Sequence, residues 1–572
     1  LMSARKFFTG IVVISNLEKL KKCKNRKQLA VLLNIAPSFL SYSLYKTSET
    51  DKYTTFQIPK RSGGTRTINA PNSELKTIQG RTSNLLYDCY KVIHPKFKNT
   101  NFELSHAFQK ERGLSIASNA ARHCNRRFVF NLDFQDFFGC FNFGRVRGYF
   151  LTNKNFQLEN EVATTLAQIC CHDNRLPQGA PTSPIVTELI TRILDLRIQK
   201  IAKDNRCSYS RYADDLTFST NKKVFPEEIA RVTEEGNWAI GYKLLNKIHN
   251  SGFIINQTKT RMHYCDSRQE ATGLIINKKV NIPKEYSKKV RSMCHSLFTK
   301  GQCHVGENPD EKVSTKVLRG MLAHIYFIKS RKNKYLKNET PAFIRQYRDF
   351  LYFQNFYNNS KPTILCEGKT DYIYLNCAIK SLYEKFQNLA KKSSNSQKVE
   401  LLISFFKYSK TSELVTTLKG GSGNFQDFVH GYDKIYETFT APTESQPVLI
   451  VIDSDQGNDK LWNMLRRTYN FEGEKWDEKF YFLTKNLYII PIPKIDNEDT
   501  CMEQLFEKNI LDTKLNGKSF SYKSDPNIKT EYGKHIFSQK VILKGQNINF
   551  SNFEGLLENI EVAISDYSNK LK

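Results

Sequence analysis

The chain has 572 residues, of which 40% are hydrophobic, so two to four domains with buried cores are expected. Its thirteen cysteines show no CxxC spacing, which argues against a disulfide framework and favours core thiols in a reducing compartment. No apolar stretch is long enough to span a membrane, so we expect no membrane partner.

The net charge of +29 is unevenly distributed along the chain. Residues 1–360 carry 58 Lys and Arg against 29 Asp and Glu, whereas residues 361–572 carry 28 of each. A basic surface can serve solubility alone, but an excess sustained over this length favours a polyanionic partner such as a nucleic acid. The sequence therefore predicts a nucleic-acid-binding part followed by a near-neutral part.

Hydrophobic periodicity and turn residues predict alternating helices and strands in the basic part. In chain order, we expect helices in 15–45, a hairpin in 53–70 around the turn signal Ser62-Gly63-Gly64, a helix in 73–93, a strand in 127–134, a Pro- and Gly-rich loop in 176–184, a helix in 185–202, a hairpin in 207–220, a helix in 240–250, a strand in 271–277 and basic helices in 283–356.

The polar segment 358–362 is the expected linker, because the charge character of the chain changes there. Beyond it, a strand in 363–366, a helix in 372–386 and a fully apolar strand in 448–453 follow one another. Strands that alternate with helices are typical of an α/β domain with a mostly parallel sheet.

Three aspartates of the basic part are placed as a site for two divalent cations requires. Asp133 ends an apolar run in FVFNLDFQDFF, and Asp214 and Asp215 form the tip of a hairpin in RYADDLTFS. Carboxylates are the hard oxygen ligands that Mg²⁺ prefers, and two such ions can drive in-line attack of a hydroxyl on a phosphate. The pattern predicts a nucleotidyl-transfer site, although an isolated Asp-Asp pair also occurs in surface turns.

The motifs around these acids resemble the palm of reverse transcriptases in sequence and in spacing. FVFNLDFQDFF, LPQGAPTSP, RYADDLTFS, INQTKTR and ATGLIIN follow in that order, and IPKRSGGTRTINAP resembles the fingers hairpin. Asn119 to His123 match the NAxxH signature of retron reverse transcriptases, and Ala271 is the one departure from their VTG motif. The resemblance covers about residues 20–320 and implies an α+β right-hand polymerase with fingers, palm and thumb.

The resemblance assigns roles to further residues of the polymerase. Lys60 and Arg66 would contact the triphosphate, and Gln178 and Gly179 would pack near the nucleotide and the template. Lys259 would donate a proton to pyrophosphate. For the lysines and the arginine, ordinary surface charge is the alternative.

Two more positions follow from the same resemblance. Phe138 lies where the family has an aromatic residue that selects dNTPs over rNTPs, with a plain core role as the alternative. Asn119 and His123, from the retron signature, would contact RNA. The basic helices 283–356 would be the thumb, in which cations meet phosphates and aromatic rings stack on unpaired bases.

Membership of the retron type would also imply partners. The enzyme would bind a cognate structured noncoding RNA, take dNTPs as substrates, prime from a 2′-hydroxyl within the RNA and make a branched RNA–DNA hybrid, called msDNA. It would work in the bacterial cytoplasm.

A second set of acids lies in the near-neutral part. Glu367 follows the strand TILC, and Asp453 and Asp455 follow the strand VLIVI. Since the carboxyl ends of parallel strands meet at one edge of a sheet, these three acids could share one or two Mg²⁺ ions.

This second set, with the glycine turn GGSGN, resembles the TOPRIM domain of topoisomerases, primases and OLD-family nucleases over residues 362–510. Asp371 and Glu503 match further metal-binding acids of OLD-type nucleases, but they could equally be solvated acids on helices. Neither a tyrosine-bearing DNA gate nor a zinc module is expected, which leaves cleavage of a nucleic-acid target by metal-activated water.

We therefore expect four segments: fingers and palm in 1–282, a basic thumb and linker in 283–360, an α/β TOPRIM domain in 361–510, and in 511–572 an extension of that domain or an interface. The resemblance to retrons with a fused effector implies antiphage defence, in which the hybrid restrains the nuclease, and favours a homo-oligomer. The alternatives are a mobile-element reverse transcriptase with an endonuclease, and a C-terminal domain that is only a scaffold.

Overall fold

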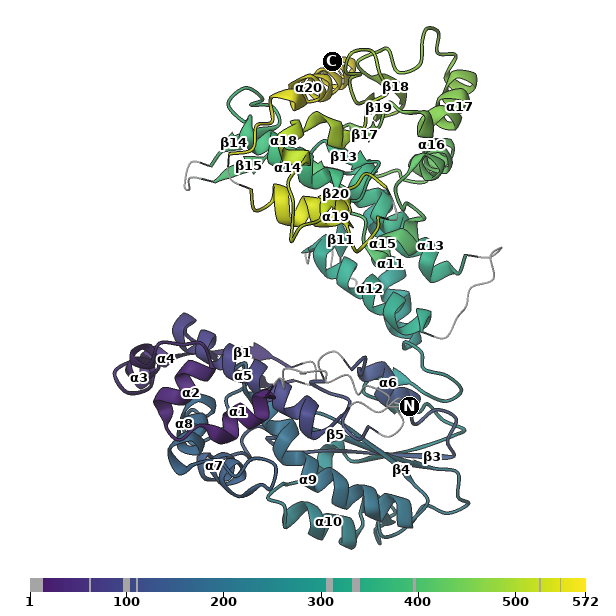
Figure 1. The fold of residues 1–572 in the computed structure, drawn as a ribbon. Helices are drawn as coiled ribbons and strands as arrows, with labels where there is room; N and C mark the ends of the chain where they lie inside the picture. Colours follow the sequence, from purple (N-terminus) through teal and green to yellow (C-terminus); the bar gives the residue numbers. More distant parts are fainter. Residues whose placement is uncertain are drawn as a thin grey trace, which may run out of the picture. The chain divides into compact units, whose positions relative to one another are not determined.

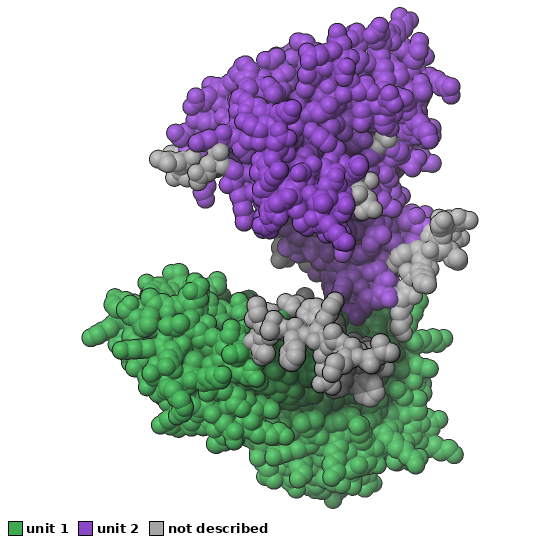
Figure 2. Space-filling view, in the orientation of Figure 1, with its two compact units in different colours: residues 1–283 green, residues 284–572 purple. Residues whose placement is uncertain are grey.

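The computed structural model describes residues 14–60, 63–95, 103–109, 112–304, 312–331, 340–393, 398–523, 526–545 and 547–571. The chain forms two compact units, residues 1–283 and 284–572 (Figure 2). The expected linker at 358–362 is not the boundary between them. Asn359 is buried there, and its amide donates to the carbonyls of Lys361 and Gln446 at 3.1 and 3.0 Å.

An antiparallel sheet with the strand order β4-β5-β3-β8 lies at the centre of the first unit (Figure 1). The interior side chains of β3 are apolar and buried, which holds the strand in the core and leaves its carboxyl end at the site. The strands are β3 (Phe128–Asp133), β4 (Ser208–Tyr212), β5 (Asp215–Thr220) and β8 (Arg261–Tyr264).

Helices cover this sheet and build the N-terminal lobe of the first unit. The long helix α9 (Ser183–Asp204) buries most of its apolar residues and packs against β4. The other helices are α1 (Asn16–Lys22), α2 (Arg26–Leu32), α3 (Pro37–Tyr45), α4 (Glu49–Lys52), α5 (Ser73–Ile93), α6 (Ile116–Ala121), α7 (Phe143–Thr152), α8 (Asn160–Cys170), α10 (Tyr242–His249) and the 3₁₀ turn η2 (Gln257–Lys259).

Three small hairpins complete the first unit. The predicted fingers hairpin is present as β1 (Tyr53–Pro59) and β2 (Thr65–Pro71), with Ser62 of its turn outside the described residues. The expected single strand at 271–277 is wrong, because Thr272 and Gly273 take positive φ values of 49° and 75° and turn the chain. The remaining short strands are β6 (Ala230–Val232), β7 (Trp238–Ile240), β9 (Glu270–Ala271) and β10 (Leu274–Ile275).

The second unit begins with the basic helices predicted for a thumb. Helices α11, α12 and α13 pack against one another, and their apolar faces are buried while Lys and Arg remain on the outside. The elements are α11 (Lys284–Lys300), β11 (Cys303–His304), β12 (Lys312–Val313), α12 (Thr315–Ser330), α13 (Ala342–Tyr352) and the π-helical segment η3 (Phe353–Tyr357).

A five-stranded sheet with the order β16-β13-β17-β19-β18 follows in the same unit. Its first four strands are parallel, as predicted, and β18 is antiparallel. Both faces of β13, β17 and β19 are buried, which explains their continuous apolar sequences. The strands are β13 (Thr363–Cys366), β16 (Ser404–Phe405), β17 (Val448–Ile452), β18 (Tyr481–Thr484) and β19 (Leu487–Pro491).

Helices lie on both faces of this sheet, with α14 and α20 on one side and α16 and α17 on the other (Figure 1). The C-terminal segment 511–572 belongs to this core, since Leu556 and Ile560 of α20 pack in one cluster with Leu449 and Ile490 of the sheet. The helices are α14 (Asp371–Ser381), α15 (Lys410–Thr416), α16 (Ser422–Tyr436), α17 (Asp459–Tyr469), α18 (Lys508–Leu511), α19 (Lys534–Ile536) and α20 (Glu554–Lys570).

Short elements connect these helices and strands: β14 (Ala390–Lys392), β15 (Val399–Leu401), β20 (Ser519–Phe520), β21 (Glu531–Tyr532), η4 (Gln456–Asn458), η5 (Met502–Leu505), η6 (Phe537–Ile542) and η7 (Ser551–Phe553). All thirteen cysteines are unpaired, as predicted. Among the described helices, none has the length and apolar character that a membrane span requires.

Candidate functional site

The first unit brings the three predicted aspartates together at one end of its sheet. Asp133 is the last residue of β3 and lies directly opposite Asp215, the first residue of β5. Ala213 and Asp214 form the two-residue turn between β4 and β5, and Ala213 adopts a left-handed φ of 55°. The carbonyl of Asp214 accepts the N–H of Phe134 at 3.0 Å, which ties the turn to the end of β3.

Burial and the mutual repulsion of the three negatively charged carboxylates raise the pKa values of Asp214 and Asp215. Burial, with the added charges of Asp214 and Asp133, raises the pKa of Asp215 to about 7. Burial and Asp133 also raise the pKa of Asp214. Lys259 places its ammonium 2.9 Å from Asp133, which partly offsets the negative charge.

This donor set fits a hard divalent cation, because only oxygen ligands converge there and a cation would relieve their mutual repulsion. Lys259 donates to one oxygen of Asp133. Across the described parts of the chain, no group of three or more Asp, Glu, His or Cys side chains is already arranged to hold a metal ion. Two Mg²⁺ ions at this site therefore remain a prediction.

A buried ion-pair cluster that was not predicted from the sequence lies beneath the hairpin. Arg211 of β4 is fully buried and forms a bidentate pair with Asp195 at 2.9 and 2.8 Å. The same guanidinium donates to Glu188 at 3.1 Å and to the carbonyl of Ala213 at 2.9 Å. Its signal in the sequence is weak, because α9 carries other charged residues too, and only the fold shows that Glu188 and Asp195 are buried.

The structure corrects the expectation that Asn119 and His123 contact RNA. Both side chains are 0% exposed. The two ring nitrogens of His123 lie 2.7 Å from the hydroxyls of Ser210 on β4 and Ser219 on β5, and Ser210 donates to Asn119 at 2.7 Å. These residues therefore hold the two strands of the catalytic hairpin from inside the protein.

The hydrogen-bond directions in this network follow from its chemistry. Burial lowers the pKa of His123 far below its ordinary value, so the ring is neutral and carries one N–H. Because Ser210 uses its hydrogen on Asn119, the Nε2 of His123 donates to Ser210 and its Nδ1 accepts from Ser219. Helix α6, which carries Asn119, also packs against β4, β9 and β10. The NAxxH signature and the ATG motif therefore lie next to each other.

The fingers hairpin contacts the loop that precedes α9. Gln178 accepts the N–H of Asn69 through its carbonyl at 2.8 Å. Gly179 has a φ of +123°, and a Cβ there would lie 2.9 Å from the carbonyl oxygen of Asn69. Only glycine allows this approach. The charge of Arg66 offsets a small part of the rise in the pKa of Asp214, whereas Lys60 is exposed at the hairpin end.

Phe138 is partly buried against the core, and its ring meets Phe137 edge-on at 5.6 Å. Its role in nucleotide selection stays a prediction. Beside the acids, a cavity of about 260 Å³ is lined by Asp133, Asp215, Lys259 and the turn Thr272-Gly273. The ATG motif thus adjoins the catalytic acids.

The second unit brings the other predicted acids to the carboxyl edge of its parallel sheet. Glu367 follows β13 and accepts the N–H of Asp453 at 3.1 Å and the amide of Asn458 at 2.8 Å. Burial, with the charges of Asp371 and Glu367, raises the pKa of Asp453 to about 8. Asp455 lies in the loop after β17 and caps η4 by accepting the N–H of Gly457 at 2.9 Å.

Asp371 and Glu503 are buried in this cluster, which excludes the alternative that they are solvated helix acids. Burial and the charge of Glu503 raise the pKa of Asp371 to about 7. Lys534 completes the cluster, with its ammonium 2.9 Å from Glu503. No sequence signal marked Lys534, which comes from the C-terminal segment.

Two glycines bring the backbone close to these acids. At Gly368 a Cβ would lie 2.3 Å from the Oδ1 of Asp371, whose Oδ2 accepts the Gly368 N–H at 2.6 Å. At Gly420, with a φ of +80°, a Cβ would lie 2.4 Å from the carbonyl of Glu367. The predicted EG and GGSGN motifs thus serve to pack the site. The donor chemistry fits a hard cation here too, and the number of ions stays a prediction.

Comparison with known proteins agrees with the first site. Residues 58–297 match the family model described as reverse transcriptase (RNA-dependent DNA polymerase). The chain is 31% identical over 290 residues to the retron Ec86 reverse transcriptase of Escherichia coli. The aligned region covers 50% of this chain and 80% of that protein. It is 30% identical over 322 residues to the retron Mx65 reverse transcriptase of Myxococcus xanthus, covering 53% and 68%.

Among solved structures, apo telomerase from Candida tropicalis matches at a TM-score of 0.27 and 13% identity, covering 41% of this chain and 56% of that chain. A similarity this low bears on neither fold nor function. The identity to the retron enzymes, over most of their length, decides the family. The chain belongs to the retron reverse transcriptases, which are RNA-directed DNA polymerases.

Proposed function

We propose that this chain copies a cognate structured noncoding RNA into a branched RNA–DNA hybrid, and that the α/β domain of its second unit, residues 361–510, is a TOPRIM nuclease which the hybrid restrains in antiphage defence. The named relatives are retron reverse transcriptases, which supports the RNA partner and the product. The basic excess up to residue 360 supports RNA binding. We expect dNTPs as substrates.

At the first site, the primer hydroxyl attacks the α-phosphate of a dNTP, a P–O bond forms, and pyrophosphate leaves. Bound Mg²⁺, held by Asp133, Asp214 and Asp215, would lower the pKa of the hydroxyl and stabilise the leaving group. Lys259 is protonated beside Asp133 and can give its proton to pyrophosphate. Arg66 carries the charge that orients the triphosphate from the fingers side.

At the second site, a water molecule attacks a phosphodiester and one P–O bond breaks. Bound Mg²⁺, held by Glu367, Asp453 and Asp455 with Asp371 and Glu503, would supply the hydroxide. Lys534 places its ammonium 2.9 Å from the buried Glu503, beside these acids, where it can stabilise the phosphate charge. The nucleic-acid target is left open.

One observation carries the nuclease proposal: acids from two adjacent parallel strands and a lysine from the far end of the sequence converge on one sheet edge. A domain that serves only as a scaffold does not need buried acids whose pKa values are raised by one another. The convergence therefore favours catalysis.

Paired variants test the proposal in cells and with purified protein. Asp214→Asn should abolish the branched hybrid, whereas Asp453→Ala should leave DNA synthesis intact and abolish both toxicity and Mg²⁺-dependent cleavage of DNA, mRNA or tRNA. Glu472→Ala, at an exposed acid of the same unit, is the control. Loss of DNA synthesis in Asp453→Ala would point to a structural role for the second unit.

A further inference from the structure

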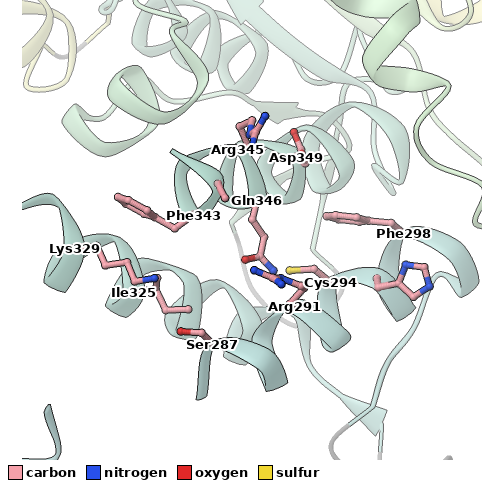
Figure 3. A pocket seen from close by; sticks show the side chains of 12 residues that line it. Ser287, Arg291, Cys294, Phe298, Ile325, Lys329, Phe343, Arg345, Gln346 and Asp349 are labelled. Carbon is pink, nitrogen blue, oxygen red and sulfur yellow. The ribbon is translucent and has the colours of Figure 1, made fainter. Parts of the chain in front are cut away.

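A cavity of about 380 Å³ lies among the three basic helices α11, α12 and α13, away from both acid clusters in the sequence (Figure 3). Neither proposed reaction uses it. Its volume is near the small end of the range for ligand pockets, and it has room for one nucleotide-sized group. Its lining includes Arg291, Cys294, Ile325, Phe343, Arg345 and Gln346.

The cavity combines an apolar interior with a cationic mouth. Cys294 and Ile325 are only 2% and 3% exposed and form apolar lining. Arg291 and Arg345 are exposed lining residues. The ammonium of Lys329 lies 5.6 Å from the ring centroid of Phe343, so a cation and an aromatic ring lie side by side in the lining. Such a pairing suits a ligand that is both planar and anionic.

The acid of this lining does not repel an anion strongly. Asp349 accepts two hydrogen bonds from the guanidinium of its neighbour Arg348, both at 3.3 Å. Burial raises the pKa of Asp349, and the cations Arg291, Lys329 and Arg345 outnumber this one acid in the lining. The balance of charge around the cavity is therefore positive.

Gln346 supplies a polar group that lacks a strong protein partner. Its side chain points from α13 toward Arg291 and Cys294 of α11 (Figure 3). Within the described residues, its amide nitrogen is buried and meets only the neighbouring thiol of Cys294, which is a weak acceptor. A buried N–H without a good acceptor is unfavourable, so an acceptor on a ligand would be stabilised there.

We propose that this cavity binds one unpaired nucleotide of the RNA that the protein carries. The base lies against Phe343, a carbonyl or ring nitrogen of the base accepts from Gln346, and the flanking phosphate meets Arg291 and Arg345. This inference rests on the proposed RNA partner and adds a specific contact for it. Base stacking on an aromatic side chain with arginine on the backbone is a general mode of single-strand recognition.

A nucleotide within a chain fits this surface better than a free one. Lys284, Lys288 and Lys289 continue the exposed positive charge along α11 beyond the cavity. Charges placed outside the cavity contribute to binding only if the ligand extends past it, as a polynucleotide does.

The test uses the full-length protein purified with its RNA from cells supplied with 4-thiouridine. Gln346→Leu removes the hydrogen-bond donor at similar volume, and Phe343→Ala removes the stacking wall. Arg466→Ala, an exposed arginine of α17, is the matched control. Copurifying RNA, photo-crosslinks to the peptide that contains residue 343, and extension of oligo(dT) on poly(rA) are measured for each.

We expect the RNA content and the crosslink to fall about tenfold in both cavity variants, with poly(rA) extension unchanged. Unchanged RNA content and crosslinks would overturn the inference. Stabilisation of the RNA-free protein by mononucleotides, with no loss of RNA in the variants, would also overturn it in favour of a free ligand. Wild-type protein that carries no RNA would instead contradict the proposed function.

Discussion

A single imidazole joins the two strands, β4 and β5, that form the hairpin with Asp214 and Asp215. His123 bridges Ser210 of β4 and Ser219 of β5, and Asn119 accepts the remaining hydrogen of Ser210. A neutral imidazole has one donor and one acceptor nitrogen, so its Nε2 donates to Ser210 and its Nδ1 accepts from Ser219. His123 is therefore a positioning residue, and its effect should reach the chemistry through the hairpin.

His123→Gln should lower kcat for primer extension about tenfold to a hundredfold, because glutamine cannot satisfy both serines in the same geometry. RNA retention and the KM for dNTPs should change little. Steady-state extension on poly(rA) and quantification of copurified RNA measure the two effects. His249→Gln, at an exposed position of α10, should behave as wild type. Loss of RNA with normal kcat would restore the direct RNA contact that the burial of His123 argues against.

At the scale of elements, the fingers hairpin depends on the loop before α9. Gly179→Ala should raise the KM for dNTPs several-fold and cost about 1–3 kcal/mol of stability, since its φ is +123° and a Cβ would meet Asn69 at 2.9 Å. Extension kinetics and thermal unfolding measure both. Gly80→Ala, within α5 where a Cβ has open space, should be neutral or slightly stabilising. Equal behaviour of the two variants would contradict the packing argument.

The elements and acids that the sequence predicted are those with strong local patterns. Apolar strands that end in acids placed Asp133, Glu367 and Asp453, and the hairpin pattern in RYADDLTFS placed Asp214, without any knowledge of contacts. The expected strand at 271–277 failed because a Thr-Gly turn inside an apolar run carries little local signal. Lys534 could not be predicted, because its role depends on a contact with Glu503 across the folded unit.

Polar residues are the ones whose positions the sequence predicted wrongly. Asn119 and His123 were expected at the surface, yet both are buried and form hydrogen bonds with the hydroxyl of Ser210 in the core. The segment 358–362 was expected to be a linker, yet Asn359 pairs its amide inside the second unit. Composition cannot reveal that a polar side chain has found its partners within the fold.

At the scale of the whole molecule, the basic excess is confined to residues 1–360. RNA binding by this part should release counterions, so the affinity should fall about a thousandfold between 50 and 200 mM salt if six or more phosphates are neutralised. Binding of the copurified RNA to RNA-free full-length protein, followed by filter retention at several salt concentrations, gives the slope of log K against log salt.

Replacing the exposed lysines of α11, Lys284, Lys288 and Lys289, by Gln should reduce that slope by about one for each phosphate that is no longer neutralised. The same replacement at Lys391, Lys392 and Lys410, exposed in the charge-balanced part, should leave the slope unchanged although the net charge falls equally. Both triple variants should keep the wild-type unfolding temperature, because isolated surface charges contribute little to stability. Equal slopes in the two variants would mean that the RNA responds to total charge, and that the basic helices of the second unit are not its binding surface.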